Sequence, residues 1–230
     1  INMSEFKLDQ IFCTPLMSFD YGKINDDENQ FISKCLESTN ENVYNFSSTE
    51  TYVLDKGLPE IRYFIEKSIR TYVETVVIGE KYDEYDFDFR ITQSWLNKTL
   101  RNSNGHHIHN HPNSFISGVF YIKVNPNVDS IVFSKPYEGL FQFPIKKYNN
   151  FNSYQWTVHV YEGQLLIFPS TLHHEVKPLQ VEMGMISSAD SDAYAEQWSD
   201  GNADRISLSF NVFPTGKIGD SAGLNELRIR

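Results

Sequence analysis

The spacing of hydrophobic residues along the chain changes near residue 88, from a helical period to the alternation that is typical of β-strands. Residues 26–38 begin with acidic side chains, which favour a helix N-terminus, and place their apolar residues on one side. Residues 59–77 predict the clearest helix, with Pro59 in its first turn and Gly79 ending it. We expect these two helices to cover one face of a sheet.

The segments after residue 88 are short, rich in β-branched and aromatic residues, and separated by Asn, Pro and Gly. Many short strands at even spacing are typical of a β-sandwich or a jelly roll. The chain is therefore predicted to be mainly β with N-terminal helices. The expected strands are 88–97, 106–111, 114–124, 129–134, 140–147, 154–161, 163–168, 171–177 and 205–213.

A length of 230 residues fits one domain of sandwich or barrel size. We expect a single domain over residues 1–230, in which residues 1–87 form a helical or mixed N-terminal support. Residues 88–213 would form the core, and residues 214–230 a C-terminal tail. Residues 181–204 are small and acidic, which indicates a long loop within the core region.

Composition and charge limit the cellular location and the binding partners that the chain can have. The net charge is −10, and such an acidic surface repels phosphate backbones, which disfavours nucleic acid as a partner. The chain shows no apolar run long enough to span a membrane and no secretory signal. Cys13 and Cys35 are too few for a disulfide framework, so we expect a reducing compartment and a cytoplasmic location. The aromatic segment 137–156 is a candidate surface for self-association into a homo-oligomer.

Four of the seven histidines lie within residues 106–111, which is tight clustering for a scarce residue. On a strand, His107, His109 and His111 share one face and His106 points away. Neutral imidazole offers a lone pair to a metal ion, and His174 is the best candidate for a ligand from a later strand. Three protein ligands leave positions open for substrate and water, as in catalytic sites. These residues alone allow iron, zinc, manganese or copper.

The segment 205–213 places Arg205, Ser207 and Ser209 on one face and apolar residues on the other. The polar face is either solvated or turned into the barrel. In the second case Arg205 would bind a carboxylate, because its planar guanidinium donates two parallel hydrogen bonds, and Ser207 would add a hydroxyl.

Four motifs within residues 91–213 carry a resemblance to a known family: SWLN, HIHNHPNSFISGVFYI, GQLLIFPSTLHHEV and RISLSFN. They resemble the 2-oxoglutarate/Fe(II)-dependent oxygenases, and specifically a little-characterised group found in bacteria and tailed phages. The resemblance implies a double-stranded β-helix (jelly-roll) core packed against helices, with Fe(II) as cofactor and 2-oxoglutarate as cosubstrate. It also implies a dioxygenase that uses O₂ to hydroxylate an unknown small-molecule or protein substrate, with release of succinate and CO₂.

The resemblance assigns the first metal ligand to His109 and the distal ligand to His174. The family's usual carboxylate ligand corresponds to His111 here, which predicts a three-histidine site. As an alternative, a water molecule fills the third position and His111 lies beside it. The link from His174 to Arg205 is longer than the family pattern, so the resemblance makes residues 181–204 an insertion near the site entrance, and we expect a lid or a substrate-contact loop.

For the cosubstrate, the resemblance assigns Arg205 and Ser207 to the far carboxylate of 2-oxoglutarate. Tyr121 resembles a strand tyrosine whose hydroxyl assists at the same carboxylate. Asn97 could reach the other end of the cosubstrate, or it could simply cap a turn.

Three other interpretations stay open from the sequence. The spacing of Gly163, Pro169 and His174 resembles a cupin motif, and a cupin-type metalloprotein need not use 2-oxoglutarate. A three-histidine zinc hydrolase or lyase would also fit the ligand set. In a non-catalytic jelly-roll binding module the histidines would be incidental, and the aromatic residues at 137–156 could form a binding platform.

Overall fold

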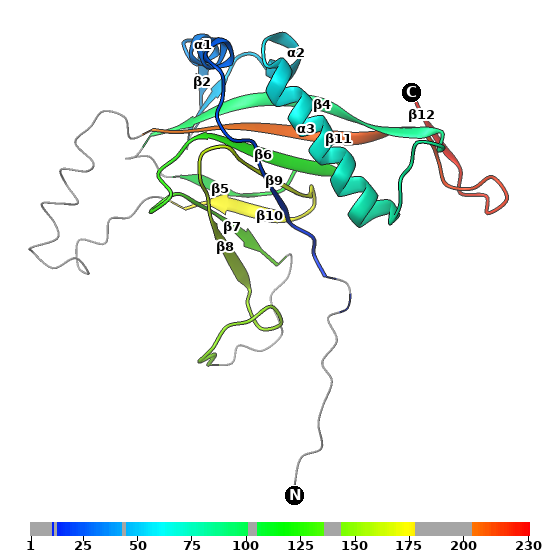
Figure 1. Ribbon diagram of the computed structural model, residues 1–230. Helices are drawn as coiled ribbons and strands as arrows, with labels where there is room; N and C mark the ends of the chain where they lie inside the picture. Colours follow the sequence, from blue (N-terminus) through cyan, green and yellow to red (C-terminus); the bar gives the residue numbers. More distant parts are fainter. Residues whose placement is uncertain (1–10, 12, 43–44, 101–104, 136–143, 178–203) are drawn as a thin grey trace, which may run out of the picture.

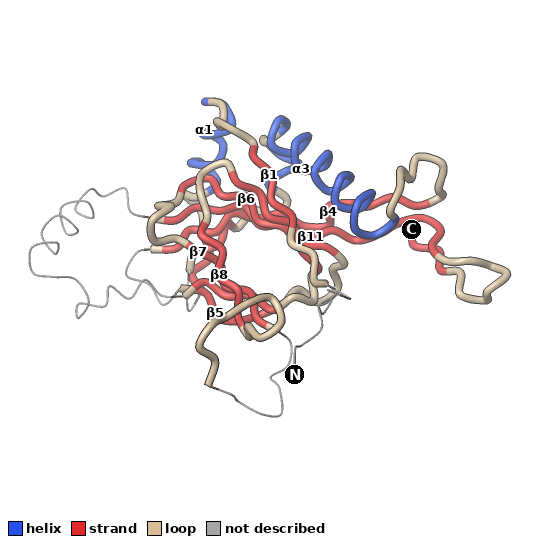
Figure 2. Tube along the Cα trace, turned by 60° about the horizontal axis from the view of Figure 1, so that its bottom comes forward, coloured by secondary structure: helices blue, strands red, loops and turns tan. Residues whose placement is uncertain are grey.

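The computed structural model describes residues 11, 13–42, 45–100, 105–135, 144–177 and 204–230. Two β-sheets face each other in this structure (Figures 1 and 2). The larger sheet has the strand order β1-β9-β6-β11-β4-β3-β2, with β12 also paired to β11, and the smaller has the order β5-β10-β7-β8. The strands are β1 (Met17–Asp20), β2 (Thr39–Glu41), β3 (Phe46–Ser48), β4 (Phe87–Thr99), β5 (His106–His109), β6 (Ile116–Lys123), β7 (Ser130–Ser134), β8 (Gln155–His159), β9 (Gln164–Pro169), β10 (His173–Val176), β11 (Arg205–Ile218) and β12 (Leu227–Ile229).

The helices α1 (Asp26–Cys35), α2 (Val53–Lys56) and α3 (Pro59–Tyr72) lie on the side of the larger sheet that faces away from the smaller one (Figure 1). The apolar side of α3 packs with the sheet residues Leu96, Leu208 and Phe210, which are fully buried. A short π-helix, Val73–Ile78, extends α3 to Gly79, whose positive φ ends the helical run as predicted. The expectation that the helices cover one sheet face is confirmed.

The two long strands β4 and β11 determine what the opposite face of the larger sheet presents. They are antiparallel, with Arg205 opposite Thr99 and Ser207 opposite Asn97. Because successive side chains alternate between faces, Leu96, Leu208 and Phe210 point to the helices and these polar residues point to the smaller sheet. The alternation in residues 205–213 therefore encodes an apolar core on one face and a polar site on the other.

Several element boundaries differ from the sequence expectations. Residues 144–147 of the expected strand 140–147 form bends and loop, and residues 140–143 lie outside the described part of the chain. β11 continues to Ile218 and pairs with β12, so described residues of the expected tail belong to the sheet. The segment expected as a lid, 181–204, also lies outside the described residues except for Asp204, whose carboxylate is 3.0 Å from the Lys98 ammonium. Across the described ranges, no helix is both long and apolar enough to cross a membrane.

A buried carboxylate joins the two main helices. Glu28 is 1% exposed, and its Oε1 accepts hydrogen bonds from the backbone N–H groups of Glu60 (2.9 Å) and Ile61 (3.0 Å) in the first turn of α3. Its Oε2 accepts hydrogen bonds from Asn25 Nδ2 (3.1 Å) and the Tyr21 hydroxyl (3.4 Å). Glu28 thus satisfies N–H groups that no residue within α3 can satisfy, and it complements the positive end of that helix.

We expect Glu28→Ala to lower the free energy of unfolding by roughly 2–4 kcal/mol, because two buried N–H groups lose their acceptor. Urea denaturation at neutral pH measures this change. Glu37→Ala, at an exposed carboxylate after α1, is the matched control and should stay within about 0.5 kcal/mol of the wild type. Equal stability of the two variants would show that Glu28 does not hold α3 in place.

Candidate metal centre

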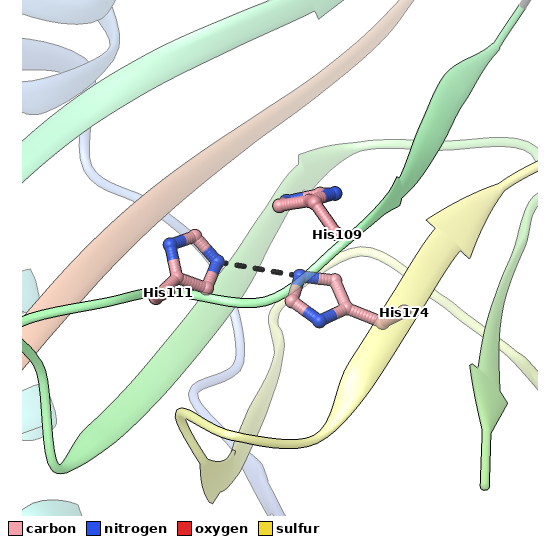
Figure 3. Close-up of side chains that lie close together, drawn as sticks. All are labelled: His109, His111 and His174. Carbon is pink, nitrogen blue, oxygen red and sulfur yellow. Dashed lines mark hydrogen bonds between the residues drawn. The ribbon is translucent and has the colours of Figure 1, made fainter. Parts of the chain in front are cut away.

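Three histidine side chains meet between the two sheets (Figure 3). His109 comes from β5, His111 from the loop that follows it, and His174 from β10. One ligand nitrogen from each of the three lies within 4.8 Å of the others, and His111 Nε2 is 3.3 Å from His174 Nε2. The structure therefore brings together the three residues that the sequence proposed as metal ligands.

Backbone carbonyl groups set the tautomers of two of these rings. His109 Nδ1 lies 2.8 Å from the carbonyl oxygen of His107, and His174 Nδ1 lies 3.0 Å from that of Leu172. A carbonyl oxygen can only accept, so each Nδ1 carries the hydrogen and donates it. The Nε2 atom of each ring is then left with its lone pair, and metal-binding histidines commonly donate their second ring N–H in this way.

An irregularity in the small sheet directs more histidines inward than alternation predicts. His109 is opposite His174, but His106 is opposite Val176, so β5 carries one more residue than β10 between the two pairs. Such a bulge reverses the facing of the residues on one side of it. The prediction that His106 points away is therefore wrong: its ring centroid lies 4.3 Å from that of His109, and both rings line the same cavity.

His111 lies beyond the end of β5, whereas the sequence placed it on the strand. Its backbone N–H donates to the Ser170 carbonyl oxygen at 3.0 Å, which anchors the loop to the end of β9. The Ser170 hydroxyl is in turn bonded to the hydroxyls of Ser114 and Ser117, each at 2.8 Å. These hydrogen bonds hold the loop that carries His111 against the end of β9.

Burial keeps these imidazoles neutral. It lowers the pKa of His174 to about 3 and that of His111 to about 4, and it also lowers the pKa of His109. A protonated ring cannot bind a metal, so a low pKa keeps the lone pairs available at neutral pH.

The same burial predicts how the stability of the metal-free protein depends on pH. Above pH 6.5 the His174 ring is neutral in both the folded and unfolded chain and adds no cost. Between 6.5 and about 3, the unfolded chain binds a proton that the folded chain excludes, so the unfolding free energy falls as the pH falls. At pH 5 this amounts to about 2 kcal/mol for one fully buried imidazole.

Urea denaturation in the presence of a chelator, at pH 7.5 and at pH 5, measures this loss. His174→Gln removes the titrating group and should lose less stability over the same interval. An equal loss in the wild type and the variant would show that His174 is not buried in its neutral form.

The predicted guanidinium lies in the same cavity as the three histidines, which has a volume of about 400 Å³. Arg205 is 4% exposed, its Nη1 donates to the Ser130 carbonyl oxygen at 2.9 Å, and its guanidinium carbon lies 5.1 Å from the centre of the Tyr121 ring. Both of these partners are uncharged. A buried cation is costly to desolvate, and a bound anion would compensate that cost.

The other proposed cosubstrate residues surround Arg205. Ser207 lies opposite both Asn97 and Tyr121 in the sheet. The Tyr121 hydroxyl is buried and forms no hydrogen bond with a described residue, and burial raises its pKa to about 12. Asn97 lines the cavity and is held at both ends of its amide, donating to Ser209 Oγ (2.9 Å) and accepting from Asn45 Nδ2 (3.3 Å). The sequence alternative that Asn97 only caps a turn does not fit its place in the middle of this network.

Several cavity residues carried no recognisable signal in the sequence. Trp95 lies on β4 with its ring centroid 6.1 Å from that of His111. The hairpin of β2 and β3 supplies Asn40, Asn42 and Asn45 to the cavity wall. Its strands are only three residues long, so no periodicity marks them, and their position depends on pairing with β4.

The donor set fits a first-row divalent metal. Three neutral imidazoles suit iron, zinc, copper or nickel, and three protein ligands leave coordination positions open. Glu175, next to His174, accepts a hydrogen bond from Gln155 Nε2 at 3.3 Å instead of joining the cluster. Among the residues that the structure describes, no carboxylate belongs to this ligand group.

Residues 93–189 match the model of a family described as "putative 2OG-Fe(II) oxygenase". No curated protein sequence matches the chain. The fold is similar to that of HygX from Streptomyces hygroscopicus, solved with nickel, 2-oxoglutarate and hygromycin B bound, at 12% identity and a TM-score of 0.51, covering 86% of this chain and 82% of that one.

Two further solved structures come from nogalamycin biosynthesis. The non-heme alpha-ketoglutarate-dependent epimerase SnoN is 8% identical, with a TM-score of 0.53 and coverage of 88% of this chain and 81% of that one. The carbocyclase SnoK is 9% identical, with a TM-score of 0.51 and coverage of 92% and 85%. At such low identity these similarities establish the fold, and they confirm the predicted jelly roll.

Proposed function

We propose that the chain is a 2OG-Fe(II) oxygenase, an oxidoreductase that hydroxylates its substrate in a reaction dependent on Fe(II) and 2-oxoglutarate. The match of residues 93–189 to a family model of that description supports this proposal. One observation supports the proposal above all: three imidazole lone pairs and a buried guanidinium share a single cavity. A metal and a dicarboxylate are the ligands that these groups fit together. A zinc hydrolase would leave the buried Arg205 without a function.

In this proposal His109, His111 and His174 hold the iron. Arg205 binds the far carboxylate of 2-oxoglutarate, and Ser207 adds a hydroxyl donor from the adjacent inward position of β11. Because Arg205 and Ser207 are two residues apart on β11, both side chains lie on the face of the larger sheet that lines the cavity.

Tyr121 and Asn97 complete the proposed cosubstrate site. The Tyr121 hydroxyl, buried beside Arg205 and unpaired among described residues, is a third donor to the same carboxylate. We assign Asn97 to the other end of the cosubstrate, and its hydrogen bonds with Asn45 and Ser209 fix the orientation of its amide.

When bound, iron and 2-oxoglutarate supply the oxidation, in which O₂ and 2-oxoglutarate yield succinate, CO₂ and an oxygen atom inserted into a C–H bond of the substrate. The residues of the chain bind, orient and exclude water. Phe133 and Phe168 pack around His174, with ring centroids 6.1 and 4.9 Å from it. This apolar contact keeps water from the inner side of the ligand ring and strengthens the electrostatic interactions around it.

We also propose that the protein acts in the cytoplasm. Cys13 and Cys35 are not joined in a disulfide, and ferrous iron and thiols both persist in a reducing compartment.

The test is a turnover measurement with the Fe(II)-loaded protein, 2-oxoglutarate and O₂ in the absence of added substrate. We expect slow uncoupled turnover, with succinate formed in proportion to the 2-oxoglutarate consumed. A chelator or the His174→Ala substitution should abolish it. Failure of the iron-loaded protein to consume 2-oxoglutarate, or turnover that persists without His174, would contradict the proposed function.

A further inference from the structure

One wall of the cavity is made of neutral amides and hydroxyls. The β2–β3 hairpin extends the larger sheet beyond β4, with Ser47 opposite Asn97. This pairing brings residues from two distant parts of the chain onto one polar surface. The surface, called here the amide wall, consists of Asn40, Asn42, Asn45, Ser47, Asn97 and Ser209.

Hydrogen bonds between its members hold the amide wall in one arrangement. Asn42 Nδ2 donates to Ser47 Oγ (3.1 Å) and to Asn45 Oδ1 (3.2 Å), and Asn45 Nδ2 donates to Asn97 Oδ1 (3.3 Å). Asn97 Nδ2 continues the chain to Ser209 Oγ (2.9 Å). A carboxamide has two N–H donors and an oxygen with two lone pairs, so each amide keeps unused capacity. The wall therefore offers fixed donors and acceptors without the entropic cost of ordering them on binding.

The lining also restricts the charge of a ligand. Among the described residues that line the cavity, Arg205 is the one Arg, Lys, Asp or Glu side chain, and the proposed cosubstrate uses it. In this described lining, a phosphate or carboxylate on the substrate has no second Arg or Lys to pair with, and an ammonium group has no carboxylate. Charged groups that lose water without a partner bind poorly, so the described lining favours a neutral substrate group.

Trp95 adds a flat apolar surface beside the amide wall. It lies two residues before Asn97 on β4, so both side chains point to the same face. Its ring is next to His111, which places the apolar surface at the metal end of the cavity. A wholly apolar substrate would cover the unused donors and acceptors of the amide wall without bonding to them, and a wholly polar one would leave the Trp95 ring without an apolar contact.

From these features, and resting on the proposed function, we infer that the substrate group oxidised here is a neutral polyhydroxylated ring of the sugar or cyclitol class. The C–H face of such a ring packs on Trp95 and presents its C–H bonds toward the histidines. The hydroxyl groups at its edge bond to the hairpin residues of the amide wall, Asn40, Asn42, Asn45 and Ser47, while Asn97 stays with the cosubstrate. A volume of about 400 Å³, shared with the cosubstrate, suits one ring of this size.

Binding by the full chain, loaded with zinc in place of iron and saturated with 2-oxoglutarate, tests the inference. Ligand-detected NMR titrations compare the neutral probes myo-inositol and methyl α-D-glucopyranoside with glucose 6-phosphate, glucosamine, adenosine and cyclohexanol. We expect the neutral polyols to bind more tightly than the charged, nucleoside and apolar probes. Asn42→Ala and Asn45→Ala should weaken polyol binding by roughly tenfold, the effect of one lost hydrogen bond. Asn127→Ala, at an exposed loop asparagine, is the matched control and should change nothing.

Calorimetric titration of 2-oxoglutarate into the same protein separates this inference from the proposed function. Absence of 2-oxoglutarate binding overturns the proposed function. Normal 2-oxoglutarate binding together with a preference for a charged, nucleoside or apolar probe, or with no polyol binding, overturns the inference alone. Polyol binding that is unchanged in Asn42→Ala and Asn45→Ala removes the amide wall from the substrate site.

Discussion

Alanine in place of His174 abolishes stoichiometric metal binding, which is the largest single effect that we expect. Of the three ligands whose nitrogens lie together, only His109 and His111 are then left, on a strand end and in the loop after it, and two imidazoles hold an ion much more weakly than three. The loss also removes a ring that is 6% exposed and whose Nδ1 is held by the Leu172 carbonyl oxygen. Metal content after anaerobic loading with Fe(II) and removal of excess ion measures the effect.

Two companion variants make this result specific. His159→Ala, on the exposed side of β8, should retain a full equivalent of metal. His111→Asp should also retain it, because a carboxylate is an equally good donor at that position. Full metal occupancy in His174→Ala would remove this residue from the ligand set.

The second large effect is on the cosubstrate. Arg205→Ala should weaken 2-oxoglutarate binding by at least about 1.5–3 kcal/mol, or roughly ten- to a hundredfold, because a charge-assisted hydrogen bond to the carboxylate is lost. Arg205→Lys keeps the positive charge but lacks the planar guanidinium, so its affinity for 2-oxoglutarate should lie between those of Arg205→Ala and the wild type. Isothermal calorimetry on the metal-loaded protein measures the affinity.

Arg228→Ala is the matched control, because the Arg228 side chain is 77% exposed and lies on β12. It should leave the affinity unchanged. If Arg205→Ala bound 2-oxoglutarate as tightly as the wild type, the buried guanidinium would need a different partner.

The residues that could be predicted from the sequence are those whose facing follows from strand alternation. Arg205 and Ser207 lie on one face of a regular strand, and the apolar residues that alternate with the polar ones along it already indicated which face meets the helices. His174 could be proposed because it follows a turn and begins a strand. The face that a side chain occupies and the start of a strand depend on neighbouring residues only, so the local sequence pattern can predict them.

The remaining features depend on pairing between distant segments. The bulge that turns His106 inward exists only in the register of β5 against β10, which no local pattern specifies. The amide wall likewise needs the three-residue strand β3 to pair with β4 across a separation of about fifty residues. His111 is held by the carbonyl of Ser170, a contact between two loops. Periodicity along the chain cannot show any of these contacts.

The measurement that tests the central claim most directly is an anaerobic titration of the metal-free protein with Fe(II), followed by 2-oxoglutarate. The account predicts that a visible metal-to-ligand charge-transfer band appears only when both are present and saturates at one equivalent of each. Such a band requires that the keto acid chelates an iron held by the protein. Iron that binds stoichiometrically and gives no band with saturating 2-oxoglutarate would contradict the account.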